Sequence, residues 1–192
     1  MRSDVFNLVE GILRIYRWER KDFRGVPTII FEDKNIIPFC GRRHIGLMAT
    51  DPSLYASRKI SYMALGFHTP TTDYVLDALD LHREHMESNI PPVGPETSEG
   101  VYKSITDIDI PVSTPPPSGS YPSHITYKVN RYSPSAPRTL TEEGLFAVHP
   151  WDTAHQTEEN TIIAYKRLST SIAIDPSMTL DIWHQIRYGS TT

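Results

Sequence analysis

The sequence is short of cysteine and of long apolar runs. Cys40 is the only cysteine among 192 residues, which excludes a disulfide framework and a zinc site built on several thiolates. No run approaches the roughly 18 apolar residues of a membrane-spanning helix. The N-terminal residues also lack the apolar stretch of a secretory signal. Phosphate-loop, dinucleotide-loop and nucleophile-elbow patterns are absent. We therefore expect a soluble intracellular protein without a common enzyme signature.

The residues that are present predict one folded domain over 1–192. Hydrophobic residues make up 39% of the chain and charged residues 22%, a balance that supports a packed core. β-branched and aromatic residues dominate 5–18 and favour a strand. Shorter strand patterns occur at 28–31, 36–39, 123–129, 145–148, 161–165 and 170–174.

Three segments have helix signals. Asp51-Pro52 offers a cap and a first-turn proline for a helix over 53–67, and Asp175-Pro176 does the same for 178–186. Apolar residues at helical spacing predict a helix over 71–87. The predicted fold class is α+β: a single domain with a mainly antiparallel sheet and two or three helices.

Proline sets residues 88–122 apart. Half of the 16 prolines lie between 91 and 122, and three glycines add further breaks. Proline and glycine both disfavour regular elements, so we expect a long, mobile Pro-rich loop or linker within the domain. Loops of this length in small domains are often functional.

Charge is unevenly spread along the chain. Residues 1–60 hold 11 basic and 7 acidic residues, a net of +4, while residues 61–192 have a net of −8. The N-terminal part could therefore contact an anionic surface, although this asymmetry is equally consistent with ordinary surface charge. The candidate contacts are Arg14, Arg17, Arg20, Lys21, Arg24, Arg42 and Arg43.

Several groups of residues could carry enzyme chemistry. Cys40 lies near Arg42, Arg43 and His44, which could lower its pKa, or it is a small buried residue. Histidines in helical or turn segments could bind a divalent metal, or serve only in packing. These are His82 with His85, and His149 with Asp152 and His155.

Two His-x-Thr triplets offer one more enzyme reading. They begin at His124 and His155, and paired triplets of this kind mark a two-histidine phosphoesterase family. No catalytic constellation is complete, so we assign no catalytic residue, metal ligand or cofactor. A small cytosolic enzyme with a histidine-based site in the C-terminal half, phosphoesterase-like or metal-dependent, stays as the alternative function.

A short proline motif points to a different class of function. Pro134, Ser135, Ala136 and Pro137 resemble the late-domain motif that viral budding proteins present to the host ESCRT-I complex. Prolines reduce the entropy lost when an extended peptide binds, and a small alanine can enter a groove. A turn in a Pro-rich chain is the alternative interpretation.

A second stretch resembles the first conserved block of rhabdovirus-type matrix proteins. It comprises His44 to Ala49, then Pro52, Tyr55, Lys59-Ile60 and Met63 to Gly66. The chain departs from the family in lacking a lysine-rich N-terminal arm and a Pro-Pro-x-Tyr motif. The resemblance implies a non-enzymatic viral structural protein that self-assembles, contacts the nucleocapsid and supports virion assembly and budding.

These inferences define the expected partners and location. We expect homo-oligomers, the viral nucleocapsid and host ESCRT-I-type machinery as partners, a peripheral membrane contact as a further candidate, and no sequence-specific nucleic acid. The expected location is the virion and the host cytoplasm, peripheral at the membrane.

Overall fold

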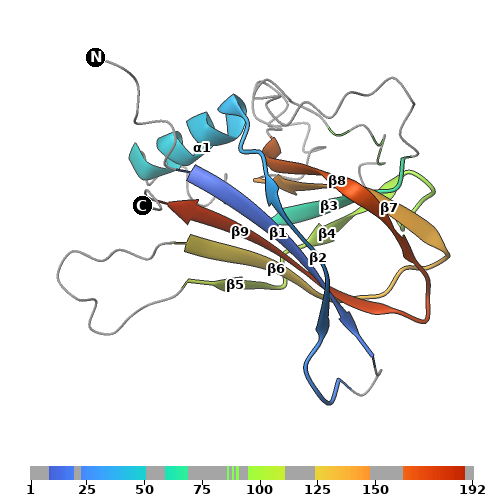
Figure 1. The fold of residues 1–192 in the computed structure, drawn as a ribbon. Helices are drawn as coiled ribbons and strands as arrows, with labels where there is room; N and C mark the ends of the chain where they lie inside the picture. The colour runs from blue at the N-terminus through green and yellow to red at the C-terminus, as the bar shows by residue number, and fades with distance from the viewer. Residues whose placement is uncertain are drawn as a thin grey trace.

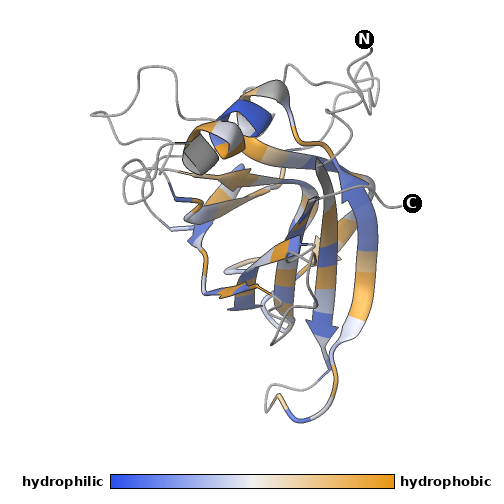
Figure 2. Cartoon of the chain, turned by 90° about the vertical axis from the view of Figure 1, so that its left-hand side faces the viewer, coloured by the Kyte–Doolittle hydropathy of each residue, from blue (hydrophilic) through white to orange (hydrophobic). Residues whose placement is uncertain are grey.

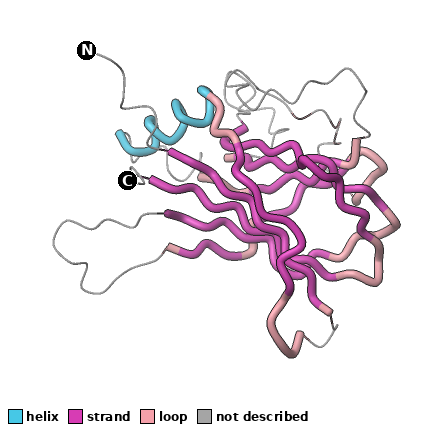
Figure 3. The backbone as a smooth tube through the Cα atoms, viewed as in Figure 1, coloured by secondary structure: helices cyan, strands magenta, loops and turns pink. Residues whose placement is uncertain are grey.

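Two antiparallel sheets form the architecture of the computed structural model (Figure 1). The structure describes residues 9–19, 23–50, 59–68, 86, 88, 90, 95–110, 124–147 and 162–188. Within these residues there are nine strands and a single helix (Figure 3). The elements are β1 (Val9–Trp18), β2 (Thr28–Asn35), α1 (Phe39–Thr50), β3 (Tyr62–Gly66), β4 (Gly100–Ser104), β5 (Asp107–Asp109), β6 (His124–Tyr132), β7 (Arg138–Phe146), β8 (Ile162–Ile174) and β9 (Thr179–Tyr188).

The chain passes repeatedly between the two sheets. Sheet A has the strand order β2-β1-β9-β6-β5, and sheet B has the order β4-β3-β7-β8. The connections β4–β5, β6–β7 and β8–β9 each cross from one sheet to the other. On one side the sheets are joined by a bridge in which Ile36 and Tyr165 exchange two backbone hydrogen bonds of 2.9 Å. The described chain is therefore a β-sandwich closed along the β2–β8 side.

The core lies between the sheets. Successive residues of a strand point alternately to its two faces, and in both sheets the apolar residues point inward. Leu13 and Ile15 of β1 are fully buried, and so are Leu180, Ile182 and Ile186 of β9. The facing layer from sheet B contributes Met63, Leu65, Leu140, Leu145 and Ile163 to the same cluster. Buried apolar area of this kind is the main stabilising contribution to a sandwich fold.

The α+β prediction with two or three helices is wrong, and β9 shows why. The segment predicted as a helix over 178–186 is a central strand, and its buried residues alternate with a period of two. The Asp175-Pro176 signal forms a turn instead. The Met178 amide donates to the Asp175 carbonyl at 2.9 Å, and the Ser177 amide donates to the Asp175 carboxylate at 2.7 Å. An acidic residue followed by proline can begin a helix or a turn.

Of the other two helix predictions, one is wrong in its C-terminal half and one falls almost entirely outside the described residues. The C-terminal half of the expected helix over 53–67 contains β3, where Tyr62–Gly66 pairs with both β4 and β7. The expected helix over 71–87 lies outside the described residues except for Met86. The observed helix, α1, begins at Phe39, the last residue of the apolar strand expected at 36–39, where the structure has only the isolated bridge at Ile36. A Cβ atom on Gly41 would lie 2.1 Å from the Ile163 carbonyl oxygen, so glycine allows α1 to approach β8.

The strand predictions agree better with the structure. Strands occur at the expected places in β1, β2 and β6, and two of them extend further than predicted; β7 shares only Leu145 and Phe146 with the strand expected at 145–148. The expected pair at 161–165 and 170–174 is one strand, β8, whose register against β7 shifts between Leu140 and Glu142. In the described part of 88–122 the chain forms β4 and β5, which corrects the expectation of a loop without packed elements there.

Candidate interaction surfaces

One histidine and one carboxylate are locked inside the sandwich. His184 of β9 and Glu143 of β7 are both fully buried, and His184 Nδ1 lies 2.8 Å from Glu143 Oε2. The Asn35 amide contacts His184 Nε2, and Gly11 leaves the space that the Asn35 side chain fills. Because no atom of the pair reaches solvent, the cluster joins sheet A to sheet B rather than forming a reaction centre.

A second buried carboxylate lies on the outer side of sheet B. Glu142 is 2% exposed; its carboxylate accepts hydrogen bonds from the Tyr165 hydroxyl at 2.8 Å and from the Ser88 amide at 2.5 Å. Burial, with a smaller contribution from the Glu142 charge, raises the pKa of Tyr102 to about 12. These contacts hold residue 88 against sheet B, so Glu142 also has a structural role.

Within the part of the chain that the structure describes, no predicted enzyme group is assembled. The Cys40 thiol donates to the Ile162 carbonyl at 3.3 Å, and His44 is buried in α1. His124 lies at the start of β6, away from the buried His184 pair. His82, His85, His149, Asp152 and His155 lie outside the described residues. Among the residues that are described, no cluster of three or more metal-ligating side chains occurs.

The predicted basic residues divide between two places. Arg14 of β1 pairs with Glu32 of β2, and Arg17 follows on the same strand. Arg24 is exposed in the β1–β2 hairpin, while Arg42 and Arg43 belong to α1 at the opposite end of the molecule (Figure 1). Arg20 and Lys21 lie outside the described residues. The described arginines therefore do not form one continuous basic face.

The Pro134–Pro137 segment forms the connection between β6 and β7. Pro134 is buried, Ser135 and Pro137 are exposed, and Ala136 is half-buried. Glu96, whose side chain is 4% exposed, holds this loop. Its carboxylate accepts from the Ser135 amide at 3.1 Å and from the Ser135 hydroxyl at 3.0 Å. The motif is therefore at the surface but fixed in a folded loop.

Glu96 also contacts the two strands that flank the loop. The Tyr132 hydroxyl donates to it at 2.6 Å, and Arg138 Nε lies 3.7 Å from its other oxygen. Burial and then the hydrogen bond to Glu96 raise the pKa of Tyr132. One buried carboxylate thus organises both ends of the β6–β7 connection, and the proline motif alone gave no indication of it.

The β1–β2 hairpin projects beyond both sheets (Figure 1). Residues 23–30, the hairpin tip, carry three of the five exposed large apolar side chains of the described chain. Val26 is 90% exposed, Ile29 51% and Ile30 36%. Figure 2 shows apolar colour on this projecting segment, away from the core. Single exposed apolar residues are common, but three together on a projection make this segment a candidate interaction surface.

The tip has a defined base. Trp18 and Phe23 pack edge to face with ring centroids 5.4 Å apart, and the Arg131 guanidinium lies 4.4 Å from the Phe23 ring centre. The Trp18 indole also donates to Asp181 at 2.9 Å. These contacts hold the start of the tip against β6 and β9, so the exposed apolar residues are presented on an anchored support.

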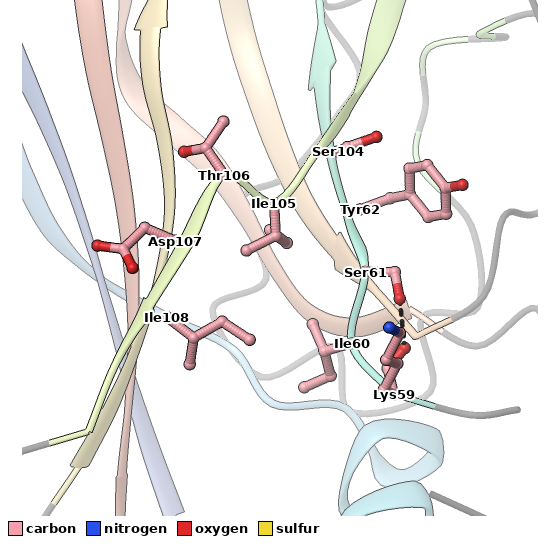
Figure 4. Close-up of a pocket in the computed structure, with 9 residues that line it drawn as sticks. All are labelled: Lys59, Ile60, Ser61, Tyr62, Ser104, Ile105, Thr106, Asp107 and Ile108. Atoms are coloured by element: carbon pink, nitrogen blue, oxygen red, sulfur yellow. Dashed lines mark hydrogen bonds between the residues drawn. The ribbon is translucent and has the colours of Figure 1, made fainter. Parts of the chain in front are cut away.

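A groove opens on the side of the sandwich opposite the Ile36–Tyr165 bridge. We call it the β5 groove. It is lined by residues 59–62 and 104–108 and has a volume of about 570 Å³. Ile60, Ile105 and Ile108 surround the space between β3 and β5 (Figure 4). Ile60 and Ile105 also pack against the main core. The groove is therefore an uncovered margin of the core among the described residues.

The Asp107 side chain of β5 points away from the space between β3 and β5 (Figure 4), and Lys59 is among the residues that line the groove. Asp107 and Asp109 both lie near the Lys128 ammonium, at 3.6 and 3.4 Å, so two carboxylates share one cation. Lys128 also lies 4.7 Å from the Trp183 ring centre. Within the described chain β5 pairs only with β6, which leaves its other edge unpaired. The groove thus combines an apolar floor with a strand edge that is unpaired within the described chain.

Comparisons with known proteins give no relative for this chain. No family model, curated protein or solved structure matches it. No helix within the described residues is long and apolar enough to cross a membrane.

Proposed function

We propose that this chain is a non-enzymatic, self-assembling structural protein of the viral matrix class. The observation that carries the proposal is the projecting hairpin tip with Val26, Ile29 and Ile30 exposed. Exposing three apolar side chains is unfavourable in an isolated monomer, and an assembly that covers them recovers the hydrophobic contribution. A structural role therefore accounts for a feature that a soluble enzyme would not need.

The interior of the protein supports the same assignment. Glu143 and His184 form a fully buried pair, and Glu142 is bound by the Tyr165 hydroxyl and the Ser88 amide. These titratable groups stabilise the sandwich and are closed to substrates. Nucleocapsid contact and virion assembly are further parts of the proposal, and they draw on the matrix-like block between His44 and Gly66.

A budding function for Pro134–Pro137 requires a change in the loop. A groove-binding partner needs an extended peptide, whereas Glu96 holds Ser135 and Tyr132 in a folded arrangement. We include recruitment of ESCRT-I-type machinery in the proposal with this condition: the Glu96 contacts must open before the motif binds. Opening lowers the apparent affinity by the fraction of molecules in the open state.

Sedimentation velocity tests the proposed function. We expect the purified protein to form larger species as its concentration rises, and a Val26→Asp variant to remain smaller. Thr170→Asp, at an exposed position of β8, serves as the matched control and should sediment like the wild type. A wild-type protein that stays monomeric at every concentration and salt level would contradict the proposal.

A further inference from the structure

We propose that Ser135 is a phosphorylation site and that a phosphate on it releases the β6–β7 connection from Glu96. The inference rests on the proposed function in one respect: an extended Pro134–Pro137 segment is the form that a groove-binding partner needs. It adds the event that extends the segment, which the proposed function requires and does not name.

Ser135 meets the two requirements of a modification that acts on this loop. Its side chain is exposed in a surface connection between two strands, so an enzyme can reach the hydroxyl. The same hydroxyl donates a hydrogen bond of 3.0 Å to Glu96 Oε1, and the Ser135 amide donates to that oxygen at 3.1 Å. The Glu96 side chain is only 4% exposed. Ser135 therefore links the solvent to the buried carboxylate that holds the connection.

Phosphorylation changes both the donor and the charge at this contact. A serine kinase transfers the γ-phosphoryl group of a nucleoside triphosphate to Ser135 Oγ: an ester bond forms there, the bond to the leaving nucleoside diphosphate breaks, and the hydroxyl proton passes to solvent. The ester oxygen can no longer donate to Glu96. A group with a charge of about −1.5 to −2 then lies beside a carboxylate that is shielded from water, and these like charges repel each other.

Arg138 offers the phosphate a new partner. Its Nε atom lies 3.7 Å from Glu96 Oε1, the oxygen that also accepts from the Ser135 hydroxyl. This Nε atom is buried and makes no hydrogen bond within the part of the chain that the structure describes. A buried donor without an acceptor is unfavourable, and phosphate oxygens form strong charge-assisted hydrogen bonds with guanidinium groups. The phosphate thus supplies the acceptor that Arg138 lacks in the folded loop.

The connection therefore has two arrangements with different partners. In the unmodified protein Glu96 accepts from Ser135 and from the Tyr132 hydroxyl, and the loop is folded. In the phosphorylated protein the phosphate pairs with Arg138, Glu96 loses its contacts with Ser135, and the segment extends. Hydrolysis of the ester by a phosphatase restores the hydroxyl donor, so the change is reversible.

Hydrogen exchange on the full chain, with phosphoserine incorporated at position 135 during translation, tests the release. We expect the Ser135 amide to exchange about tenfold faster, or more, than in the unmodified protein, because it no longer donates to Glu96. Phosphoserine at position 177 is the matched control: Ser177 is also exposed and bonds a carboxylate, that of Asp175, in a different turn. This control should leave the exchange of the Ser135 amide unchanged. Mass spectrometry of the chain expressed in eukaryotic cells should find phosphate on Ser135.

Either of two results would overturn the inference. If the Ser135 amide exchanges at the same rate with and without the phosphate, the phosphate does not release the loop. If Ser135 carries no phosphate in cells treated with phosphatase inhibitors, it is not a modification site. The proposed function is tested separately, because Glu96→Ala opens the loop without a phosphate. Release by phosphoserine, together with failure of Glu96→Ala to bind an ESCRT-I motif-reading domain, would support the phosphorylation site and contradict the budding function.

Discussion

Replacing Glu96 with alanine removes the carboxylate that organises the β6–β7 connection. The Tyr132 hydroxyl, buried with the rest of that residue, then loses its 2.6 Å acceptor. A buried polar group left unpaired costs about 1–3 kcal/mol. Losing the Ser135 amide bond adds about 1 kcal/mol, because Ser135 is exposed and water replaces the acceptor. We therefore expect Glu96→Ala to lower the free energy of unfolding by about 2–4 kcal/mol.

Chemical denaturation with two comparison variants measures this effect. Glu96→Gln keeps an acceptor for Tyr132 and should lose less than half as much stability. Arg138→Ala removes only the 3.7 Å ion pair and should cost less than about 1 kcal/mol. If Glu96→Ala and Glu96→Gln unfold at the same denaturant concentration as the wild type, the contacts of Glu96 do not hold the loop.

The same variant tests whether the loop restrains the proline motif. If opening the loop costs about 2 kcal/mol, the wild-type affinity for an ESCRT-I motif-reading domain is about 30-fold weaker than that of the free peptide. We expect Glu96→Ala to recover most of this difference in a titration at low temperature, where the variant stays folded. Equal affinities of wild type, variant and peptide would show that the motif is already accessible.

Three further predictions concern buried groups and metals. Glu143→Ala should destabilise the protein by about 3–5 kcal/mol because His184 loses its buried partner. Replacing both Glu143 and His184 with leucine should cost less than the sum of the two single replacements. Calorimetry on the wild type, the two single leucine variants and the double variant measures this difference. The raised pKa of Tyr102 means that stability is fully present below pH ~10 and falls by about 2–3 kcal/mol as the pH rises to about 12. Denaturation at stepped pH should show a shallower fall in Tyr102→Phe, and an identical slope would refute the assignment. Chelation should leave the melting temperature unchanged, whereas zinc that survives purification and is lost in His149→Ala would favour the enzyme alternative.

Local sequence patterns predicted several strands but not which strands pair with each other. The composition of 5–18 identified β1, because β-branched and aromatic residues dominate this segment and favour a strand. The signals around Asp175-Pro176 favoured a helix, since a cap and a turn share the same residues. Only pairing with β1 and β6 makes 179–188 a central strand. Tertiary packing also decides α1, whose two glycines suggest no helix.

The candidate site could be predicted only in part. The proline motif was visible as four adjacent residues, but Glu96 is 39 residues away from Ser135 and has no local pattern that links it to the loop. The apolar segment at 28–31 was recognised as a strand, yet burial of such residues is the default expectation. The exposure of Ile29 follows from the projection of the hairpin beyond the sandwich, which depends on the lengths of the paired strands.

The position of β9 has a consequence for how the protein is made. Both β1 and β6 hydrogen-bond to β9, so sheet A consists of two separate hairpins, β1–β2 and β5–β6, until residues 179–188 leave the ribosome. Each hairpin then presents an unpaired edge and an apolar inner face to the solvent. Sheet A is therefore completed only once β9 has been made, through pairing of β1 with β9, which lie far apart in the sequence and so meet slowly. A chain that stops before β9 would retain both unpaired edges, and unpaired edges promote aggregation.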